Sequence, residues 1–207
     1  MSDPGYGDFE FERKFFVREL PAELLAGSSP DLIVQSYYLA SEGYALRVRL
    51  QAPAPASPYG RDTAGLLAAV AGQWSMCTLT AKGPAVGGTR YEAERELDPL
   101  VAEEMVRRGG AKVSKLRHAV WLGEDGWVLD EFLGMNAPLI IAECERGGPV
   151  TDLVIPEFCL TEISEDARFG NEYLGSRPYA AWADDFEAEL AAGRSGYLQS
   201  FGRNQQV

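Results

Sequence analysis

The sequence alternates charged and apolar residues along many short segments, and this two-residue period is the feature that most limits its fold. Successive side chains of a β-strand point to opposite faces, so each such segment has one apolar face and one charged face. Gly, Pro and Ser separate the segments, as they do at turns. The pattern predicts nine strands. Their ranges are Asp8–Val17, Leu32–Leu39, Tyr44–Gln51, Ser75–Lys82, Arg90–Leu97, Val113–Leu122, Gly126–Leu133, Leu139–Arg146 and Phe158–Ile163.

Helices are predicted in fewer places. The clearest follows Asp98, a capping residue, has Pro99 in its first turn and ends at Gly109. The other predicted helices are Pro21–Leu25, Asp62–Gln73 and Tyr179–Ala192, the last with Trp182 and Phe186 on one face. The Pro/Ala-rich stretch from Gln51 to Tyr59 predicts a loop, and the last dozen residues are expected to fray. Antiparallel strands with a few helices indicate a mainly β, α+β barrel.

Composition excludes several classes of protein. The 207 residues, 46% hydrophobic and 24% charged, fit one globular domain over 1–207. A net charge of −12 disfavours a nucleic-acid duplex as partner. No run of 18 apolar residues predicts a membrane span, and the acidic start does not resemble a signal peptide, so the cytoplasm is the expected location. A homodimer is left open.

Cysteine and histidine chemistry is also disfavoured. Cys77, Cys144 and Cys159 are far apart and no C-x-x-C occurs, so neither a disulfide framework nor a zinc site is expected. His118 is the single histidine, which excludes serine, cysteine or metal chemistry that needs several histidines. We interpret His118 as a structural strand residue.

The charges on the predicted strands occur in pairs of one sign. One strand face carries Glu10, Glu12 and Lys14, and others carry Arg47 with Arg49, Thr78 and Thr80 with Lys82, Glu92 with Glu94, Lys115 with Arg117, and Glu143 with Glu145; Asp130 stands alone. A solvent-exposed sheet face would explain any single pair. Separate acidic and basic pairs on different strands instead favour several strands that aim their charges at one ligand.

A closed barrel would turn these faces inward. A barrel of about eight strands has an interior that holds side chains or one small ligand. Buried carboxylates then need a cation, and buried Arg and Lys need an anion. Hard oxygen ligands favour Mg²⁺ or Mn²⁺, and arginine forks match phosphate oxygens. A metal–polyphosphate complex supplies both the cation that the carboxylates need and the anion that the Arg and Lys residues need.

These residues resemble the motifs of the CYTH superfamily, also called triphosphate tunnel metalloenzymes. Its E-x-E-x-K signature is similar to EFERK at Glu10–Lys14. The later elements appear in the same order as RVR (Arg47–Arg49), LTAKG (Leu79–Gly83), RYEAE (Arg90–Glu94), KLR (Lys115–Arg117), WVLDEFLG (Trp127–Gly134), AECE (Ala142–Glu145) and LTEISEDARFGNEYL (Leu160–Leu174). The resemblance covers about residues 8–178, which leaves a C-terminal helix and tail at 179–207. It implies a closed eight-stranded antiparallel barrel with flanking helices.

The resemblance also implies roles for single residues. The metal-site candidates are Glu10, Glu12, Asp130, Glu143 and Glu145, and Glu92 and Glu94 either hold a second metal or orient the basic residues. The substrate-binding candidates are Lys14, Arg47, Arg49, Lys82, Arg90, Lys115 and Arg117, and Glu162 holds a further matching position. Lys14 is a candidate to orient the attacking water, or else a salt-bridge partner of Glu12. Tyr38 is a candidate proton acceptor, or else an aromatic residue that fills the barrel mouth.

Two features depart from the family pattern. The Q-G-Y-L strand appears as VQSYYL, so Tyr38 takes the tyrosine position only if the Tyr-Leu pair sets the register; a shift of one residue offers Tyr37 instead. The stretch from Gln51 to Ser75 is longer than compact members need. We interpret it as a surface excursion, the alternative being a lid over one mouth.

The expected activity is metal-dependent hydrolysis of inorganic triphosphate or a related small triphosphate, by attack of water on a terminal phosphorus. Three alternatives stay open: a class IV-type adenylate cyclase, a thiamine triphosphatase, and a polyphosphate or nucleotide sensor without turnover.

Overall fold

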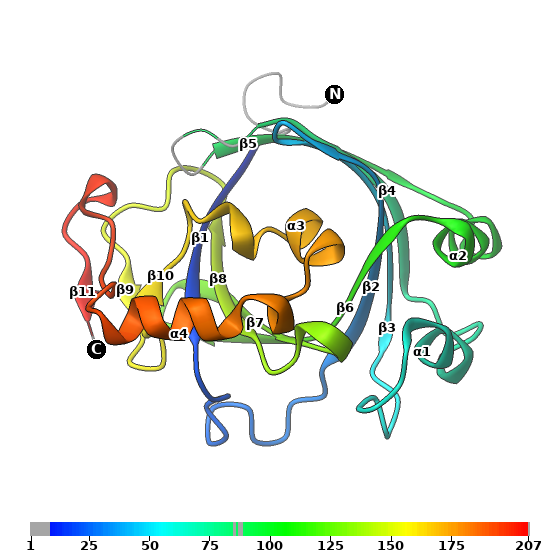
Figure 1. Ribbon diagram of the computed structural model, residues 1–207, viewed down its shortest axis with the longest axis horizontal. Helices are drawn as coiled ribbons and strands as arrows, with labels where there is room; N and C mark the ends of the chain where they lie inside the picture. Colours follow the sequence, from blue (N-terminus) through cyan, green and yellow to red (C-terminus); the bar gives the residue numbers. More distant parts are fainter. Residues whose placement is uncertain (1–8, 85, 87–88, 207) are drawn as a thin grey trace.

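A computed structural model describes residues 9–84, 86 and 89–206 of the chain, so Asp8 and Val207 lie outside the described residues. The strands surround a central space (Figure 1). They are β1 (Phe9–Val17), β2 (Asp31–Ser41), β3 (Tyr44–Pro53), β4 (Met76–Lys82), β5 (Thr89–Glu96), β6 (Ala111–Leu122), β7 (Asp125–Phe132), β8 (Ile140–Arg146), β9 (Val154–Ile155), β10 (Thr161–Glu162) and β11 (Gln205–Gln206).

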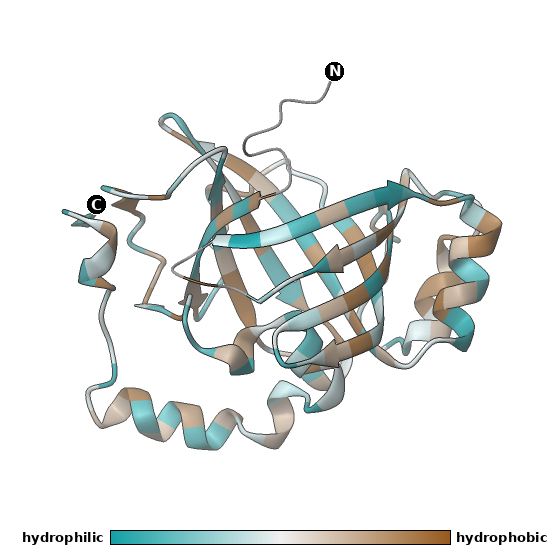
Figure 2. Ribbon diagram, turned by 90° about the horizontal axis from the view of Figure 1, so that it is seen from above, coloured by the Kyte–Doolittle hydropathy of each residue, from teal (hydrophilic) through white to brown (hydrophobic). Residues whose placement is uncertain are grey.

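Within the described residues, eight antiparallel strands close into a barrel. Their order is β1-β5-β4-β3-β2-β6-β7-β8, and β8 pairs back with β1 from Phe11 to Val17. Hydropathy alternates along the strands, as the sequence pattern predicts (Figure 2). The predicted mainly β barrel is therefore confirmed. The ninth predicted strand, Phe158–Ile163, shortens to β10, which pairs with β1 beyond the end of β5.

Four α-helices occur in the described residues: α1 (Thr63–Ala69), α2 (Pro99–Arg108), α3 (Asn171–Ser176) and α4 (Ala183–Ala191). The short 3₁₀ helices are η1 (Gly134–Asn136), η2 (Ala167–Phe169), η3 (Tyr179–Ala181) and η4 (Gln199–Phe201). The Asp98 carboxylate caps α2 as predicted, by accepting two backbone N–H bonds. Across the same described residues, no helix has the length and apolarity needed to span a membrane.

Three helix predictions need correction. The segment Pro21–Leu25 forms turns instead of a helix. The helix predicted over Asp62–Gln73 is confined to α1, and the one over Tyr179–Ala192 divides into η3 and α4 at Trp182. Helix α3 has no counterpart among the predicted helices, because its six residues are too few to show a helical period.

Apolar clusters cover the outside of the barrel. Helices α1 and α2 lie beside β3 and β4 (Figure 1), and their buried residues Leu66, Leu67 and Val106 pack on outward residues such as Val48 and Leu50. The Gln51–Ser75 excursion therefore lies against the outer wall, which agrees with a surface excursion. Trp127 centres a second outer cluster.

A third cluster fills one end of the interior. Wall residues that continue the inward faces, including Phe16 and Ile141, meet apolar side chains from α3 and α4. The ring of Phe186 packs edge-on against Phe16 at 5.1 Å and against Phe169 at 4.9 Å. In Figure 1, α3 projects into the outline of the ring while α4 crosses in front of it. The C-terminal segment thus closes an end that the eight strands leave open.

The C-terminal tail is ordered against the wall, which overturns the expected fraying. Strand β11 pairs in parallel with β9, and Phe201 is buried. Outward-facing Arg13, fully buried, forms a two-bond pair with Glu162 at 2.8 and 2.7 Å and also bonds Asn204 of the tail at 2.7 Å. A buried charge needs such partners, so the tail cannot detach without a large free-energy cost.

Phe186→Ala tests the apolar end. Removing a buried phenylalanine that contacts several rings should lower the free energy of unfolding by about 3–5 kcal/mol. Urea denaturation measures the change. Leu100→Ala, at an 80% exposed position of α2, is the control and should change stability little. Equal effects of the two substitutions would contradict the packing described.

Candidate functional site

Inward side chains of the barrel surround a cavity of about 460 Å³, here called the charged cavity. All but four of the predicted site residues line it. The lining residues are Phe9, Glu10, Glu12, Lys14, Arg47, Arg49, Lys82, Glu92, Glu94, Arg117, Glu143, Glu145 and Asn171. The period of two in the sequence is the reason, because alternate residues of each strand point to the same side.

The strand order divides the cavity into an acidic and a basic side. Strands β8, β1 and β5 are neighbours in the barrel and supply all the carboxylates that line the cavity. Strands β4, β3 and β6 lie in the rest of the ring and supply its arginines and Lys82. Lys14 on β1 is the exception, a cation placed within the acidic side. Closure of the barrel therefore places the two sets of charges across one space.

Lysines partly neutralise the acidic side. Lys82 lies 2.7 Å from Glu10 and 2.6 Å from Glu92. Burial alone would raise the pKa of Glu10, but Lys82 together with a hydrogen bond to Glu92 lowers it to about 2. Lys14 lies 2.8 Å from Glu12. Burial and the nearby Glu10 carboxylate raise the pKa of Glu12 by more than the Lys14 ammonium lowers it, so the pKa of Glu12 is raised overall.

Glu145 is the least compensated carboxylate of the cavity. Burial raises its pKa, and the neighbouring carboxylates, Glu10 and Glu12 foremost, raise it further. It forms no ion pair with any described residue, whereas Glu143 is paired with Arg117 at 2.8 Å. A cation placed here would relieve repulsion among several oxygens.

The basic side has the opposite imbalance. Burial and the neighbouring Arg47 and Arg117 lower the pKa of Arg49 to about 10. Arg49 forms no ion pair with any described residue, and its one polar partner is the Gln35 amide, turned so that its oxygen accepts from Nε at 3.1 Å. The buried Nε of Arg47 and hydroxyl of Thr78 have no hydrogen-bond partner among the described residues. An anion with several oxygens would satisfy these donors.

Lys115 and Asp130, predicted as a phosphate and a metal ligand, are not among the residues that line the charged cavity. Both are fully buried and pair with each other at 2.5 Å. Asp130 also accepts two bonds from Arg117, at 2.7 and 2.6 Å. Burial lowers the pKa of Lys115 to about 8 despite the Asp130 carboxylate. The pair fixes the position of Arg117 from behind.

The structure places Tyr37, not Tyr38, on the inward face of β2. A β-bulge between Tyr37 and Leu39 changes the register, so Tyr38 lies outside with 41% of its surface exposed. Its hydroxyl lies beside Gly109 at the end of α2. Tyr37 is buried and bonds Gln35 at 2.9 Å. Burial raises the pKa of both phenols, so neither is a base at neutral pH.

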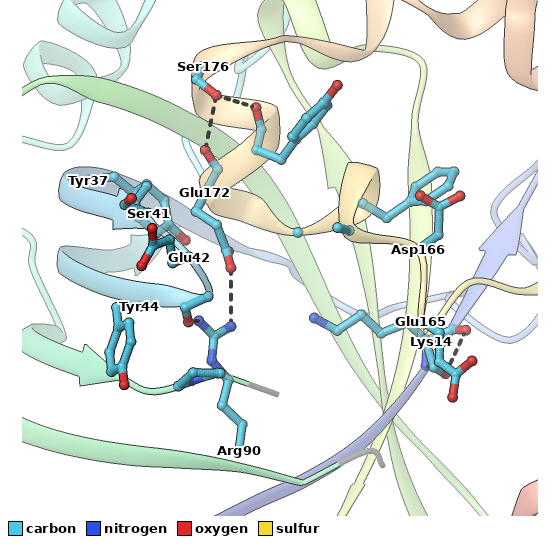
Figure 3. A pocket seen from close by; sticks show the side chains of 18 of the residues that line it. Lys14, Tyr37, Ser41, Glu42, Tyr44, Arg90, Glu165, Asp166, Glu172 and Ser176 are labelled. Atoms are coloured by element: carbon cyan, nitrogen blue, oxygen red, sulfur yellow. Dashed lines mark hydrogen bonds and ion pairs between the residues drawn. The ribbon is translucent and has the colours of Figure 1, made fainter. Parts of the chain in front are cut away.

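Arg90 lies at a second cavity of about 700 Å³, here called the mouth cavity, which adjoins α3 and the β2–β3 hairpin. Figure 3 shows its guanidinium directed at Glu172 of α3, and the two lie 3.2 Å apart. Arg90 also donates to the carbonyl oxygens of Gly83 and Gly43. Arg90 therefore ties α3 to two hairpins and does not line the charged cavity, where substrate binding was predicted. His118 lies on the outer face of β6 with Leu116, as interpreted.

Three cavity contacts were not predicted from the sequence. Thr80 donates to Glu94 at 2.9 Å, Gln35 orients Arg49, and Asn171 of α3 accepts from Lys115 at 3.3 Å. Alternation already places Thr80 on the face of Lys82, although it does not predict the bond to Glu94. Asn171 has no such signal, because it enters the barrel from a helix far along the chain.

The donor set of the acidic side fits a hard divalent cation. It consists of carboxylate oxygens, the ligands that Mg²⁺ and Mn²⁺ prefer. In the described part of the chain, no group of three carboxylate, imidazole or thiol residues is arranged to hold an ion. A cation would be stabilised best beside Glu145, because this carboxylate has no ion-pair partner among the described residues and the neighbouring carboxylates raise its pKa.

Comparisons with known proteins agree with this geometry. No family model matches the chain. A protein of Acetivibrio thermocellus named inorganic triphosphatase is 34% identical over 103 residues, which are 49% of this chain and 66% of that protein. The chain thus matches just under two thirds of that relative's length.

The similar solved structures share the fold. The crystal structure of the inorganic triphosphatase NE1496 has a TM-score of 0.52 and 23% identity, and covers 80% of this chain and 93% of that chain. A second structure, titled the hypothetical protein NE1496, has a TM-score of 0.51 with 23% identity over 80% of this chain and 97% of its own. At this identity the likeness concerns the barrel alone.

The fold and the charged interior define a β-barrel with a cavity between an acidic and a basic side. The chain shares this barrel fold with the inorganic triphosphatase NE1496 and is similar in sequence to part of the Acetivibrio thermocellus protein.

Glu145→Gln tests the repulsion on the acidic side. The folded-state pKa of Glu145 is raised, so its ionised form costs stability above that pKa and the cost disappears as the pH falls through it. Without metal and at pH 7, the variant should melt at a slightly higher temperature, because solvent screens much of the repulsion at this exposed position, and the gain should shrink at pH 4. Thermal melts in EDTA measure it. The exposed Glu157→Gln is the control; an equal gain there, or none at Glu145, would contradict the repulsion.

Proposed function

We propose that this protein hydrolyses inorganic triphosphate or a related small triphosphate, with Mg²⁺ or Mn²⁺ as cofactor. The observation that carries the proposal is the charged cavity, where the Arg49 guanidinium and the Glu145 carboxylate have no ion-pair partner among the described residues. A metal–triphosphate complex supplies an anion to one side and a cation to the other. The similarity to the Acetivibrio thermocellus inorganic triphosphatase supports the same reaction.

The basic side would bind and orient the phosphate chain. Arg47, Arg49 and Lys82 line the cavity on neighbouring strands, and Arg117 is held rigid by Asp130. Arginine forks stabilise the charge that develops on the phosphoryl oxygens, and preorganised groups do so at little reorganisation cost. This arrangement favours a compact triphosphate over a single phosphate, because several cations are spread along the cavity.

The metal candidates are Glu10, Glu12, Glu92, Glu94, Glu143 and Glu145; among the described residues, Glu145 has only carboxylate neighbours that raise its pKa, and Glu94 accepts a hydrogen bond from Thr80. The cation, when bound, supplies charge neutralisation to the phosphate oxygens and to the attacking water. Lysine ammonium groups that now pair with these carboxylates are free to turn toward the phosphates once the carboxylates have another partner.

Lys14 would orient the water and does not act as a base. Burial opposes its charge, but Glu12 and Glu143 together raise its pKa above the ordinary lysine value. It therefore stays protonated at neutral pH and can only donate hydrogen bonds. Its ammonium lies 2.8 Å from Glu12 and 3.5 Å from Glu143, a position from which it can contact both water and phosphate.

A substrate panel tests the function. Purified protein is incubated with inorganic triphosphate, ATP, thiamine triphosphate or long-chain polyphosphate and with Mg²⁺ or Mn²⁺, and phosphate release is measured. We expect the highest kcat/KM with inorganic triphosphate and no turnover in EDTA. Glu12→Gln, which removes a carboxylate oxygen donor with little change of shape, should lower turnover by about 100-fold or more.

Other outcomes of the panel would reassign the protein. Cyclic AMP from ATP would identify a cyclase, and preferred release from thiamine triphosphate would identify a thiamine triphosphatase. Tight binding of triphosphate with no phosphate release under any metal would identify a sensor. Unchanged turnover in Glu12→Gln would remove Glu12 from the metal site.

Arg49→Ala tests the basic side. Loss of hydrogen bonds from a charged group costs about 1.5–3 kcal/mol, so kcat/KM for triphosphate should fall about 10- to 100-fold. Steady-state kinetics measure it, and KM should rise because ground-state binding is weakened. Arg95→Ala, on the exposed outer face of β5, is the matched control and should leave both constants unchanged. A change in melting temperature alone would mean that Arg49 is structural.

A further inference from the structure

One edge of strand β1 pairs with two different strands along its length, and the change occurs beside the charged cavity. Residues Phe9–Phe11 pair with β5, whereas Phe15 and Phe16 pair with β10. Between these two pairings, the edge of β1 at Lys14 has no strand partner among the described residues, while the other edge pairs with β8 from Phe11 to Val17. A buried backbone group needs a hydrogen bond, so something other than a strand must hold this edge.

Ser164 is the residue that does so. The Lys14 N–H donates to the Ser164 hydroxyl at 3.0 Å, and the Lys14 carbonyl oxygen accepts from the Ile163 N–H at 2.9 Å. A hydroxyl has one hydrogen, and Ser164 donates it to Glu162 at 2.8 Å. Its lone pairs are therefore left to face Lys14.

Glu162 is itself fixed on all sides. Its side chain is fully buried, both oxygens accept from Arg13, and one also accepts from the Leu198 N–H at 2.7 Å. The Arg13 guanidinium is held further by Asn204 and by the Phe201 ring, 4.7 Å from its carbon. A rigid chain of hydrogen bonds thus runs from the C-terminal tail outside the barrel to the Lys14 backbone.

The Lys14 side chain points the other way, into the charged cavity. Side chains of adjacent strand residues project to opposite faces, so buried Arg13 lies outside while Lys14 lies inside. A shift of the backbone at this point moves the Lys14 ammonium relative to Glu12 and Glu143.

We propose that Ser164, braced by the Arg13–Glu162 pair, is a positioning residue that sets the place of the Lys14 ammonium for triphosphate. The proposal rests on the proposed function, in which Lys14 contacts triphosphate. It gives the buried pair a role beyond anchoring the tail.

A double-mutant comparison tests the coupling. Inorganic triphosphate binding is measured by calorimetry in EDTA for the wild type, Ser164→Ala, Lys14→Ala and the double variant. Loss of one hydrogen bond should weaken binding about fivefold when Lys14 is present. In the Lys14→Ala background the same change should alter Kd by less than about twofold, because no ammonium remains to be positioned.

Amide hydrogen exchange supplies a readout that needs no substrate. Exchange at the Lys14 N–H should accelerate in Ser164→Ala and not in Ser75→Ala. Ser75 likewise has a hydroxyl bonded to a backbone group, the Gln51 carbonyl oxygen, but lies away from β1. The control should also bind triphosphate as the wild type does.

Three results would overturn the proposal: unchanged Lys14 exchange in Ser164→Ala, unchanged Kd in that variant, or an equal loss of affinity in both backgrounds, which marks a merely structural serine. A wild type that neither binds nor hydrolyses triphosphate would instead refute the proposed function, and Lys14 exchange would still decide whether Ser164 holds the strand.

Discussion

Opposite charges confined in one closed barrel are the constraint on which the rest of the structure depends. Buried ions cost several kcal/mol each when they are unpaired, so an interior with this many ionised groups must compensate each sign. Lys14 does this within the acidic side, and Lys82 and Arg117 reach across from the basic side to Glu10 and Glu143. Glu145 and Arg49 are left over. The excess negative charge on the acidic side and the excess positive charge on the basic side together indicate the charge pattern of the ligand better than any single residue does.

Stability must come from elsewhere, because the interior supplies little of it. The outer wall carries two apolar clusters under α1, α2 and the chain around Trp127, and a third cluster closes one end with Phe186. The barrel is therefore apolar outside and at its closed end and charged in the rest of its interior, and helices and loops cover the outer apolar surface. This separation leaves the inward positions free to serve binding.

Much of this arrangement follows from the period of two in the sequence. It placed the eight barrel strands and the inward face of each, because no strand can turn single residues to the other side without a bulge. It failed at Tyr38 for that reason, since the bulge after Tyr37 is not visible as a break in the pattern. It also could not separate cavity-lining residues from buried ones on the same face, so Lys115 and Asp130 were included with Arg117.

Long-range packing is the part that the sequence concealed. Helix α3 and the tail after Gln199 lack strong local signals, yet Asn171 enters the cavity and Asn204 reaches Arg13. Arg13 shows why. In the sequence it is a charged residue between two site residues and is indistinguishable from a solvated one, but it is buried outside the barrel against Glu162, 149 residues away. A strand that presents ligands on one face needs a support on the other, and here both are built from charge. The inward residues of β1 line the cavity and are available to bind a ligand, whereas its outward arginine is fully paired. One face of the strand is therefore fixed by the fold, and the other face can serve binding.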